Sequence, residues 1–172
     1  MVEAWNAPLP LRWAAGLAGA GLIAWIAWRG RALTASGAWS AAAMGGGYFA
    51  LGGPFWYGLL LAFFMTSVFW SRWKRHARSK REAEKRYAKT GRRDAGQVWA
   101  NGGVGLALLA AYAIRPEPLI AAAFVGVMAS VNADTWATEI GALSRAEPRS
   151  VLTGRAVPAG TSGGVTPLGT AA

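Results

Sequence analysis

The sequence contains no cysteine and a single histidine, His76. Without cysteine the chain can form no disulfide, no thiolate metal site and no cysteine nucleophile. One histidine within a basic run supplies neither a multi-histidine metal site nor a Ser-His-Asp triad. These chemistries are therefore excluded.

Charged residues are also scarce, at 15% of the 172 residues, whereas hydrophobic residues make up 53% and tryptophan occurs ten times. This composition is typical of helices that face lipid. The net charge of +10 arises largely from one segment, because eleven of the eighteen Lys and Arg residues lie between Arg72 and Arg93. Membrane topology explains that clustering better than nucleic acid binding does, so no nucleic acid partner is expected.

The long apolar stretches predict a polytopic, all-α bundle that forms a single integral membrane domain over residues 1–172. The forty residues 32–71 carry no charge and would extend about 60 Å as one helix, twice the bilayer core. Because Gly52, Gly53 and Pro54 interrupt them, a helical hairpin is expected. About five spans are predicted, near residues 11–28, 36–51, 55–70, 95–114 and 118–137.

The remaining segments are predicted to be loops, a basic one over residues 71–94 and a glycine-rich one over residues 142–168. Leu168 to Ala172 resembles the start of another helix, so the chain is expected to be a truncated form of a larger bundle. Arginines in alternate loops place the N-terminus outside a cell membrane and the polar motifs in the cytosol, while Arg12 and Arg115 fall on the other side. The basic loop is interpreted mainly as a positive-inside segment, with binding of anionic lipid headgroups or phosphate as a second role.

Two carboxylates, Asp134 and Glu139, stand where the last apolar run ends. The uncharged part of that span covers about 24 Å, so Asp134 is expected within or at the edge of the membrane, where such residues are usually paired, hydrated or functional. A functional role is favoured over a structural one. On a straight helix the two carboxylates project about 140° apart. They can share one cation only if the helix unwinds between them. The alternative for Glu139 is a solvated carboxylate at a helix end.

Helical spacing groups the polar residues around these carboxylates into two faces. Asn132, Thr135 and Glu139 share one face, and Asp134, Thr138 and Gly141 share another. One face is expected to hold a metal and the other to anchor the helix.

A matching stripe, Asp94, Gln97 and Asn101, begins the fourth span with the same i, i+3, i+7 spacing. These residues either form hydrogen bonds between helices or complete a site with Asp134, and the sequence leaves the two interpretations even.

Gly160 to Thr170, GTSGGVTPLGT, is rich in residues that expose backbone N–H groups. It lacks the lysine of a Walker phosphate loop. The hydroxyl groups of Thr161, Ser162 and Thr166, helped by Arg155, are candidates for binding phosphate. A flexible connector is the interpretation that composition alone favours.

Three motifs in order, GRRDAGQVWANGG, NADTWATEIG and VPAGTSGGVTPLGT, carry a family resemblance. Together they resemble the integral membrane family labelled domain of unknown function 92, which includes transmembrane protein 19 and the plant phytyl-phosphate kinase. The resemblance covers most of the chain from about Arg31 onward. It implies a multi-helix membrane protein, and family members continue with further membrane helices beyond the last motif.

The resemblance further implies a kinase that transfers a phosphoryl group from a nucleoside triphosphate to an isoprenoid monophosphate of phytyl or prenyl type, with Mg²⁺ as cofactor. Its expected partners are membrane lipids, the isoprenoid phosphate and the nucleotide. The alternative is a transporter or lipid-binding protein without catalytic activity.

The family pattern assigns catalysis to Asp134, Thr138 and Glu139, with the metal on Asp134 and Glu139. Candidate substrate- or phosphate-binding residues are Arg92, Arg93, Asp94, Gln97, Asn101, Arg155, Gly160, Thr161, Ser162, Gly163 and Gly164.

Overall fold

The structure is a computed structural model that describes residues 7–73 and 92–172. His76 and most of the predicted basic loop therefore lie outside the described residues. The chain divides into two compact units. The first comprises the described residues up to Phe64 together with residues 92–130, and the second comprises residues 65–73 and 131–172.

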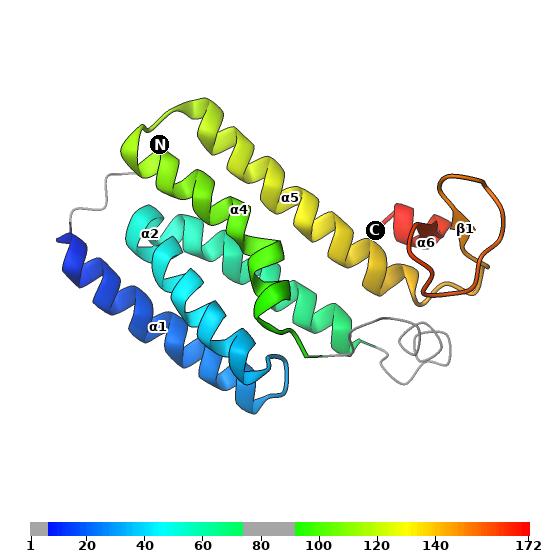
Figure 1. The fold of residues 1–172 in the computed structure, drawn as a ribbon, viewed down its shortest axis with the longest axis horizontal. Coiled ribbons are helices and arrows are strands. Elements are labelled where there is room, and N and C mark those ends of the chain that lie inside the picture. The colour runs from blue at the N-terminus through cyan, green and yellow to red at the C-terminus, as the bar shows by residue number, and fades with distance from the viewer. Residues whose placement is uncertain (1–6, 74–91) are drawn as a thin grey trace. The chain divides into compact units, whose positions relative to one another are not determined.

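Within the described residues, four helices are long and apolar enough to cross a membrane. They are α1 (Leu9–Arg29), α2 (Ala35–Arg72), α4 (Ala95–Ile114) and α5 (Pro118–Gly141) (Figure 1). Their interiors carry almost no charge, which is the property that lets a helix reside in hydrocarbon. The predicted all-α, polytopic fold is confirmed. Helix α5 continues past the predicted end at residue 137 and stops at Gly141.

Helix α2 consists of two arms, residues 35–52 and 54–72, that meet at Gly53. Gly53 has φ 77° and ψ −168°, a conformation that glycine adopts readily, and Pro54 then begins the second arm. A Cβ added at Gly45 would lie 3.1 Å from Cε2 of Tyr57, although these residues would be about 18 Å apart on one continuous helix. The second arm therefore folds back on the first, and the four helices supply five apolar segments.

Small residues let the helices of the first unit approach closely. A Cβ at Gly16 of α1 would lie 2.9 Å from the carbonyl oxygen of Gly46 in α2. Between α4 and α2, Tyr48 donates a hydrogen bond of 2.9 Å to the carbonyl oxygen of Gly102 and is fully buried. Shape matching of this kind holds helices together in lipid, where apolar side chains gain little from leaving the solvent.

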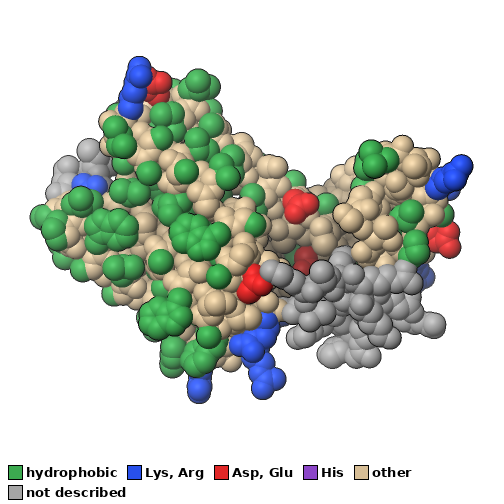
Figure 2. All heavy atoms as spheres, in the orientation of Figure 1, with side chains coloured by type: hydrophobic (Ala, Val, Ile, Leu, Met, Phe, Trp, Pro, Cys, Tyr) green, Lys and Arg blue, Asp and Glu red, His purple; other side chains and the backbone are tan. Residues whose placement is uncertain are grey.

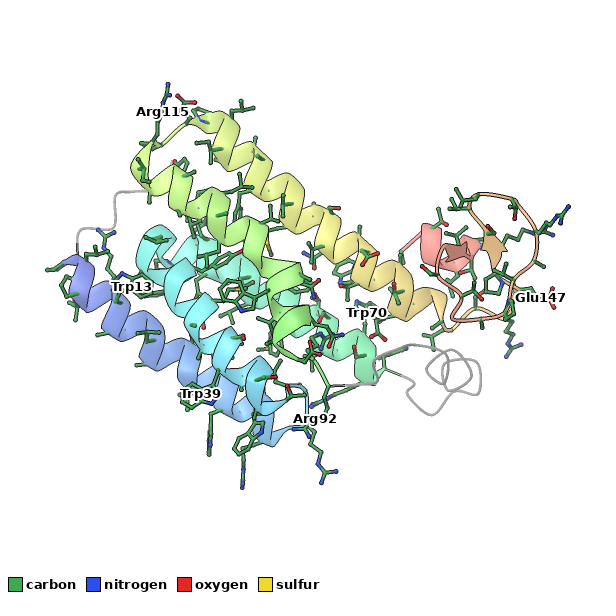
Figure 3. The ribbon with its side chains drawn as sticks, in the orientation of Figure 1. Trp13, Trp39, Trp70, Arg92, Arg115 and Glu147 are labelled. Atoms are coloured by element: carbon green, nitrogen blue, oxygen red, sulfur yellow. The ribbon has the colours of Figure 1, made fainter. Side chains whose placement is uncertain are left out.

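The outer surface of the first unit is apolar. Trp39 is 79% exposed and Ile114 is 87% exposed. Figure 3 shows Trp39 on the outer side of the helices, and Figure 2 shows hydrophobic side chains spread over the face of the helical part, with Lys and Arg at its edges. A surface with these properties matches a hydrocarbon environment.

A short connection ties the chain after α1 to the chain before α4. Leu33 and Arg93 form a parallel β-bridge, in which Arg93 N donates to Ala32 O and Thr34 N donates to Arg93 O, each at 3.0 Å. Arg92 adds two hydrogen bonds from its guanidinium to Leu33 O, at 2.9 and 3.2 Å. This connection fixes the backbone from which the Arg93 side chain starts.

The second unit contains the ends of α2 and α5, a two-stranded antiparallel ribbon of β1 (Arg149–Ser150) and β2 (Gly164–Val165), and the short helix α6 (Pro167–Thr170). The ribbon lies in the segment predicted to be a loop, whereas α6 overlaps Leu168 to Ala172, which were predicted to resemble the start of a helix. Strands of two residues are too short to produce an alternating pattern of polar and apolar residues, so they leave no periodic signal in the sequence.

Candidate functional site

The end of helix α5 carries the two predicted faces on unbroken helix. Regular helix extends through Asp134 and Glu139 to Gly141. On such a helix the two carboxylates project about 140° apart. The unwinding that a shared cation requires is therefore not seen.

The face with Glu139 anchors α5 to the end of α2. Ser71 Oγ donates a hydrogen bond of 2.5 Å to Glu139 Oε1. Trp136 Nε1 donates to Thr66 Oγ1 at 3.3 Å, and the Trp136 ring lies 6.4 Å from that of Trp70. These contacts set the rotation of α5 about its own axis.

The face with Asp134 and Thr138 is open. Both residues are exposed, and the Asp134 carboxylate forms no hydrogen bond or ion pair with any residue that the structure describes. A carboxylate near the membrane is costly unless it is hydrated, paired or bound to a cation. The structure thus leaves Asp134 available as a ligand while Glu139 has a protein partner.

The glycine-rich segment returns to α5 next to this open face. A Cβ at Gly169 would lie 2.7 Å from the carbonyl oxygen of Ala137 and 3.1 Å from Cα of Gly141. Thr166 caps α6, because its Oγ1 accepts a hydrogen bond of 3.1 Å from Gly169 N. Since Ala137 follows Asp134 by one helical turn on the same side, α6 packs beside the face that carries Asp134.

Two of the three hydroxyl groups predicted to bind phosphate form hydrogen bonds within the glycine-rich segment itself. Thr161 Oγ1 donates to Pro158 O at 2.7 Å, and Thr166 is buried as the cap of α6. Ser162 and Gly163 are exposed, and neither their amide N–H groups nor the Ser162 hydroxyl donates to a described residue. Gly163 has φ 74°, one of several left-handed glycines here. The donors available to a phosphate are therefore centred on Ser162 and Gly163.

The remaining predicted residues of this segment have structural contacts or lie in the open. Gly164 lies in β2, and its amide donates to Thr161 O at 3.0 Å. Gly160 has φ 84°, which is the conformation that favours glycine at a turn. Arg155 is exposed, and its carbonyl oxygen accepts from Ser150 N at 2.9 Å, so the ribbon holds its backbone.

Asp94 and Gln97 form a helix cap in the first unit. Asp94 Oδ1 accepts from Gln97 N at 2.9 Å, and Gln97 Oε1 accepts from Asp94 N at 3.1 Å. This reciprocal pair is the capping box of α4. The cap has a signal in the sequence, an acidic residue followed three positions later by glutamine just before an apolar run, which the interpretation as a polar stripe overlooks.

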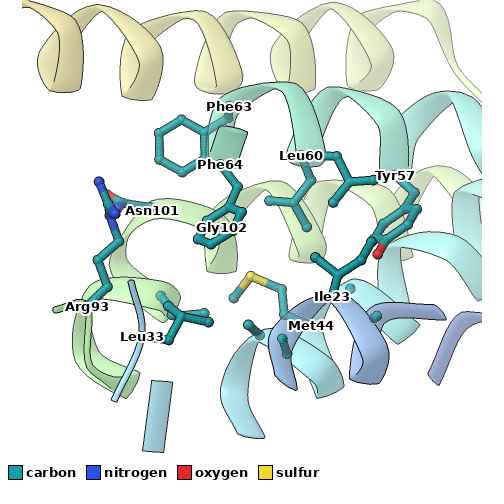
Figure 4. A pocket seen from close by; sticks show the side chains of 16 residues that line it. Ile23, Leu33, Met44, Tyr57, Leu60, Phe63, Phe64, Arg93, Asn101 and Gly102 are labelled. Carbon is teal, nitrogen blue, oxygen red and sulfur yellow. The ribbon is translucent and has the colours of Figure 1, made fainter. Parts of the chain in front are cut away.

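Asn101 and Arg93 line a cavity of about 70 Å³ in the first unit. Figure 4 shows the two side chains on the same side of this cavity, among residues from α1, both arms of α2 and α4. No local pattern in the sequence indicates the cavity, because its walls come from segments that are far apart along the chain.

The acidic side chains suit an ion that is shared with a phosphate rather than a closed protein metal site. No group of three or more His, Cys, Asp or Glu residues that could hold a metal occurs within the described ranges. Mg²⁺ is commonly held by one or two carboxylates, with water and substrate phosphates completing its shell. The open Asp134 carboxylate fits that mode of binding.

A curated relative and a family match place this chain among known proteins. It is 32% identical over 125 residues to Protein PGR of Arabidopsis thaliana, an alignment that covers 64% of this chain and 43% of that protein. The chain thus spans less than half the length of this relative. No solved structure matches it. Over residues 18–172 the sequence matches the family described as integral membrane protein DUF92, so the chain belongs to that family, as its motifs predicted.

Proposed function

We propose that this DUF92 membrane protein is a phosphotransferase that moves a phosphoryl group from a nucleoside triphosphate to an isoprenoid monophosphate of phytyl or prenyl type. The observation that carries the proposal is the contrast between the two carboxylates of α5. Glu139 is bound to Ser71, whereas Asp134 is exposed without a partner among the described residues. A carboxylate that has no partner among the described residues, at the end of an apolar helix, suggests a bound cation.

Asp134 would hold Mg²⁺ together with the phosphates of the nucleotide, and the ion would supply the charge neutralisation that phosphoryl transfer requires. Glu139 would act as a positioning residue, because its hydrogen bond to Ser71 sets the rotation of α5 and hence the direction of Asp134. This division replaces a metal shared by both carboxylates.

The other residues of the second unit would bind phosphate. The N–H groups of Ser162 and Gly163 and the hydroxyl groups of Ser162 and Thr138 are donors suited to phosphate oxygens. Arg155 would offset negative charge. A phosphate acceptor is already ionised and needs no strong general base, which agrees with the scarcity of histidine.

A multi-pass position in the cell membrane, with the motif loops in the cytosol, completes the proposal. In the first unit, Arg92 and Arg115 lie toward opposite ends of the helices (Figure 3). Arg29, Arg31, Arg92 and Arg93 gather near one end. By the positive-inside rule, this excess of arginine supports a cytosolic position for that end. Nucleotide and Mg²⁺ are abundant there.

The test is Asp134→Asn in the protein reconstituted in lipid nanodiscs with phytyl or farnesyl phosphate, Mg²⁺ and γ-labelled nucleoside triphosphates. We expect diphosphate formation to fall by about 10²–10³-fold, the scale of a lost electrostatic contact at the reacting group, while the melting temperature is retained. The matched control is Glu117→Gln, a carboxylate that pairs with Arg115 at 2.6 Å outside the site. Normal turnover by Asp134→Asn would remove Asp134 from the mechanism.

The cavity beside Asn101 favours one alternative, a lipid-binding or transport protein without catalysis. The two functions differ in nucleotide binding. Absence of any Mg²⁺-dependent binding of nucleoside triphosphates by the purified protein would reject the kinase and leave the alternative.

A further inference from the structure

We propose that the cavity of the first unit is the recognition site for the phosphate-proximal end of the isoprenoid monophosphate. In this site Arg93 and Asn101 bind the phosphate and the apolar walls hold the first branched segment of the chain. The identity of the ligand rests on the proposed function, whereas the site itself rests on the geometry of the cavity.

The walls are apolar and come from several segments of the chain. Ile23 belongs to α1, Met44 to the first arm of α2, Leu60 and Phe64 to the second arm, and Leu33 to the connection after α1 (Figure 4). Such a lining favours a hydrocarbon ligand. Because both arms of α2 contribute, the fold at Gly53 creates this space.

Polar groups gather at one side of the cavity. The Arg93 side chain extends toward Asn101 in Figure 4, and its backbone is held by the hydrogen bonds to Ala32 and Thr34. Asn101 is partly buried in α4, and its side-chain amide has no hydrogen-bond partner within the described chain. Its amide is therefore available to form hydrogen bonds with a ligand that enters the cavity. A guanidinium beside an amide matches the oxygen atoms of a phosphate.

The volume limits what part of the ligand enters. About 70 Å³ is less than half of the roughly 150 Å³ apolar cavity that accommodates benzene in an engineered protein. A long isoprenoid chain exceeds this space, and a branched five-carbon unit, which is close to benzene in size, enters it only in part. With the phosphate at Arg93, the segment inside is the one next to the phosphate, and the remaining tail lies in lipid. The site therefore recognises the phosphate and the carbon atoms next to it, and it accepts isoprenoid tails of different lengths.

Two alanine residues of α2 allow ligand binding in the cavity to be tested by substitution. Ala41 lines the cavity from the first arm of α2, and Ala43, two positions later, is exposed. Leucine at position 41 fills the space, whereas leucine at position 43 adds the same atoms outside it. The pair therefore separates filling of the cavity from the general effect of a larger side chain in α2.

The experiment measures binding of farnesyl phosphate to the protein in nanodiscs without nucleotide. We expect Ala41→Leu to raise the Kd by about tenfold or more and Ala43→Leu to leave it within about twofold. Arg93→Gln and Asn101→Ala should weaken farnesyl phosphate but not farnesol, because the alcohol carries no phosphate. Dodecyl phosphate, which is unbranched, should bind more weakly than farnesyl phosphate.

A photoreactive diazirine placed near the phosphate of a farnesyl phosphate analogue supplies a second measurement that needs no variant. We expect its adducts on peptides from α2 and α4 around Met44 and Asn101. Unchanged affinity of Ala41→Leu, equal binding of farnesol and farnesyl phosphate, or adducts confined to other peptides would each overturn the proposal.

These outcomes are separable from those for the kinase. Binding that follows this pattern in a protein without transfer activity would reject the proposed function and keep the site. Transfer activity with a KM that Ala41→Leu leaves unchanged would keep the function and reject the site. The Asp134→Asn variant should bind farnesyl phosphate with normal affinity, because Asp134 does not line the cavity.

Discussion

In the first unit the fully buried large side chains are hydrophobic or aromatic, among them Tyr48, Phe124 and Leu109, whereas in the second unit the buried positions include Ser67 and Thr166. The first unit packs glycines against bulky groups, as at Gly105, where an added Cβ would collide with Tyr48 Oη. The second joins α2 to α5 by hydrogen bonds. Close packing of complementary surfaces therefore holds the helices of the first unit together, whereas hydrogen bonds orient the candidate site in the second unit.

A similar contrast exists within the second unit, between the two faces of α5. The polar groups of one face form hydrogen bonds with α2, whereas the side chains of Asp134 and Thr138 on the other face form no hydrogen bond with the described residues. Because one face of α5 is held by α2, the side chains on the opposite face project in a fixed direction. Variants that interfere with shape packing in one unit and hydrogen bonding in the other therefore test the comparison.

The largest stability effect is expected from Gly105→Ala in the first unit. The new Cβ would collide with Tyr48 Oη, which is fully buried and cannot move aside easily, so we expect a loss of about 2–3 kcal/mol. Gly126→Ala in α5 is the control, since nothing lies within 4 Å of its added Cβ. Thermal unfolding in detergent measures both variants. Equal stability of the two would show that close glycine packing does not hold the first unit together.

A smaller effect is expected from Ser71→Ala in the second unit. Removing this donor to the Glu139 carboxylate should cost about 1.5–2 kcal/mol, the lower end of the range for a hydrogen bond to a charged group, because the pair is only partly buried. Ser67→Ala, one helical turn earlier, is the matched variant. The Ser67 hydroxyl is buried and has no hydrogen-bond partner among the residues described, so its removal should leave stability unchanged or slightly higher.

Turnover gives a second measurement for this pair. If Ser71 orients α5 through Glu139, Ser71→Ala should lower kcat of the proposed reaction by about tenfold while Ser67→Ala leaves it unchanged. Equal behaviour of the two serine variants in both stability and turnover would contradict the anchoring role of the Glu139 face.

The smallest effect is expected from Asp94→Ala at the start of α4. Loss of the capping box should cost about 1 kcal/mol. Asp94→Asn or Asp94→Ser should restore most of that stability, because both side chains cap helices well. Turnover should follow stability, since the Asp94 carboxylate caps α4. A loss of activity in a stable Asp94→Asn protein would instead place this carboxylate in the chemistry.

Much of the fold followed from local properties of the chain. The uncharged stretches predicted the membrane helices, and Gly52, Gly53 and Pro54 predicted the reversal that occurs at Gly53. The small ribbon was missed because two-residue strands leave no periodic signal. For the candidate site, periodicity grouped Asp134 with Thr138 and Glu139 with Asn132, but it did not tell which face would be anchored.

The sequence by itself determined the family, the membrane-spanning character and the position of each carboxylate along its helix, because apolar run length and helical periodicity are properties of neighbouring residues. Only the tertiary structure decided which carboxylate of α5 is engaged, because Glu139 accepts its hydrogen bond from Ser71 of α2. It also brought Arg93 and Asn101 to one cavity with both arms of α2. Contacts across distant segments depend on how helices pack, and packing in lipid is governed by shape and hydrogen bonding that no single segment encodes.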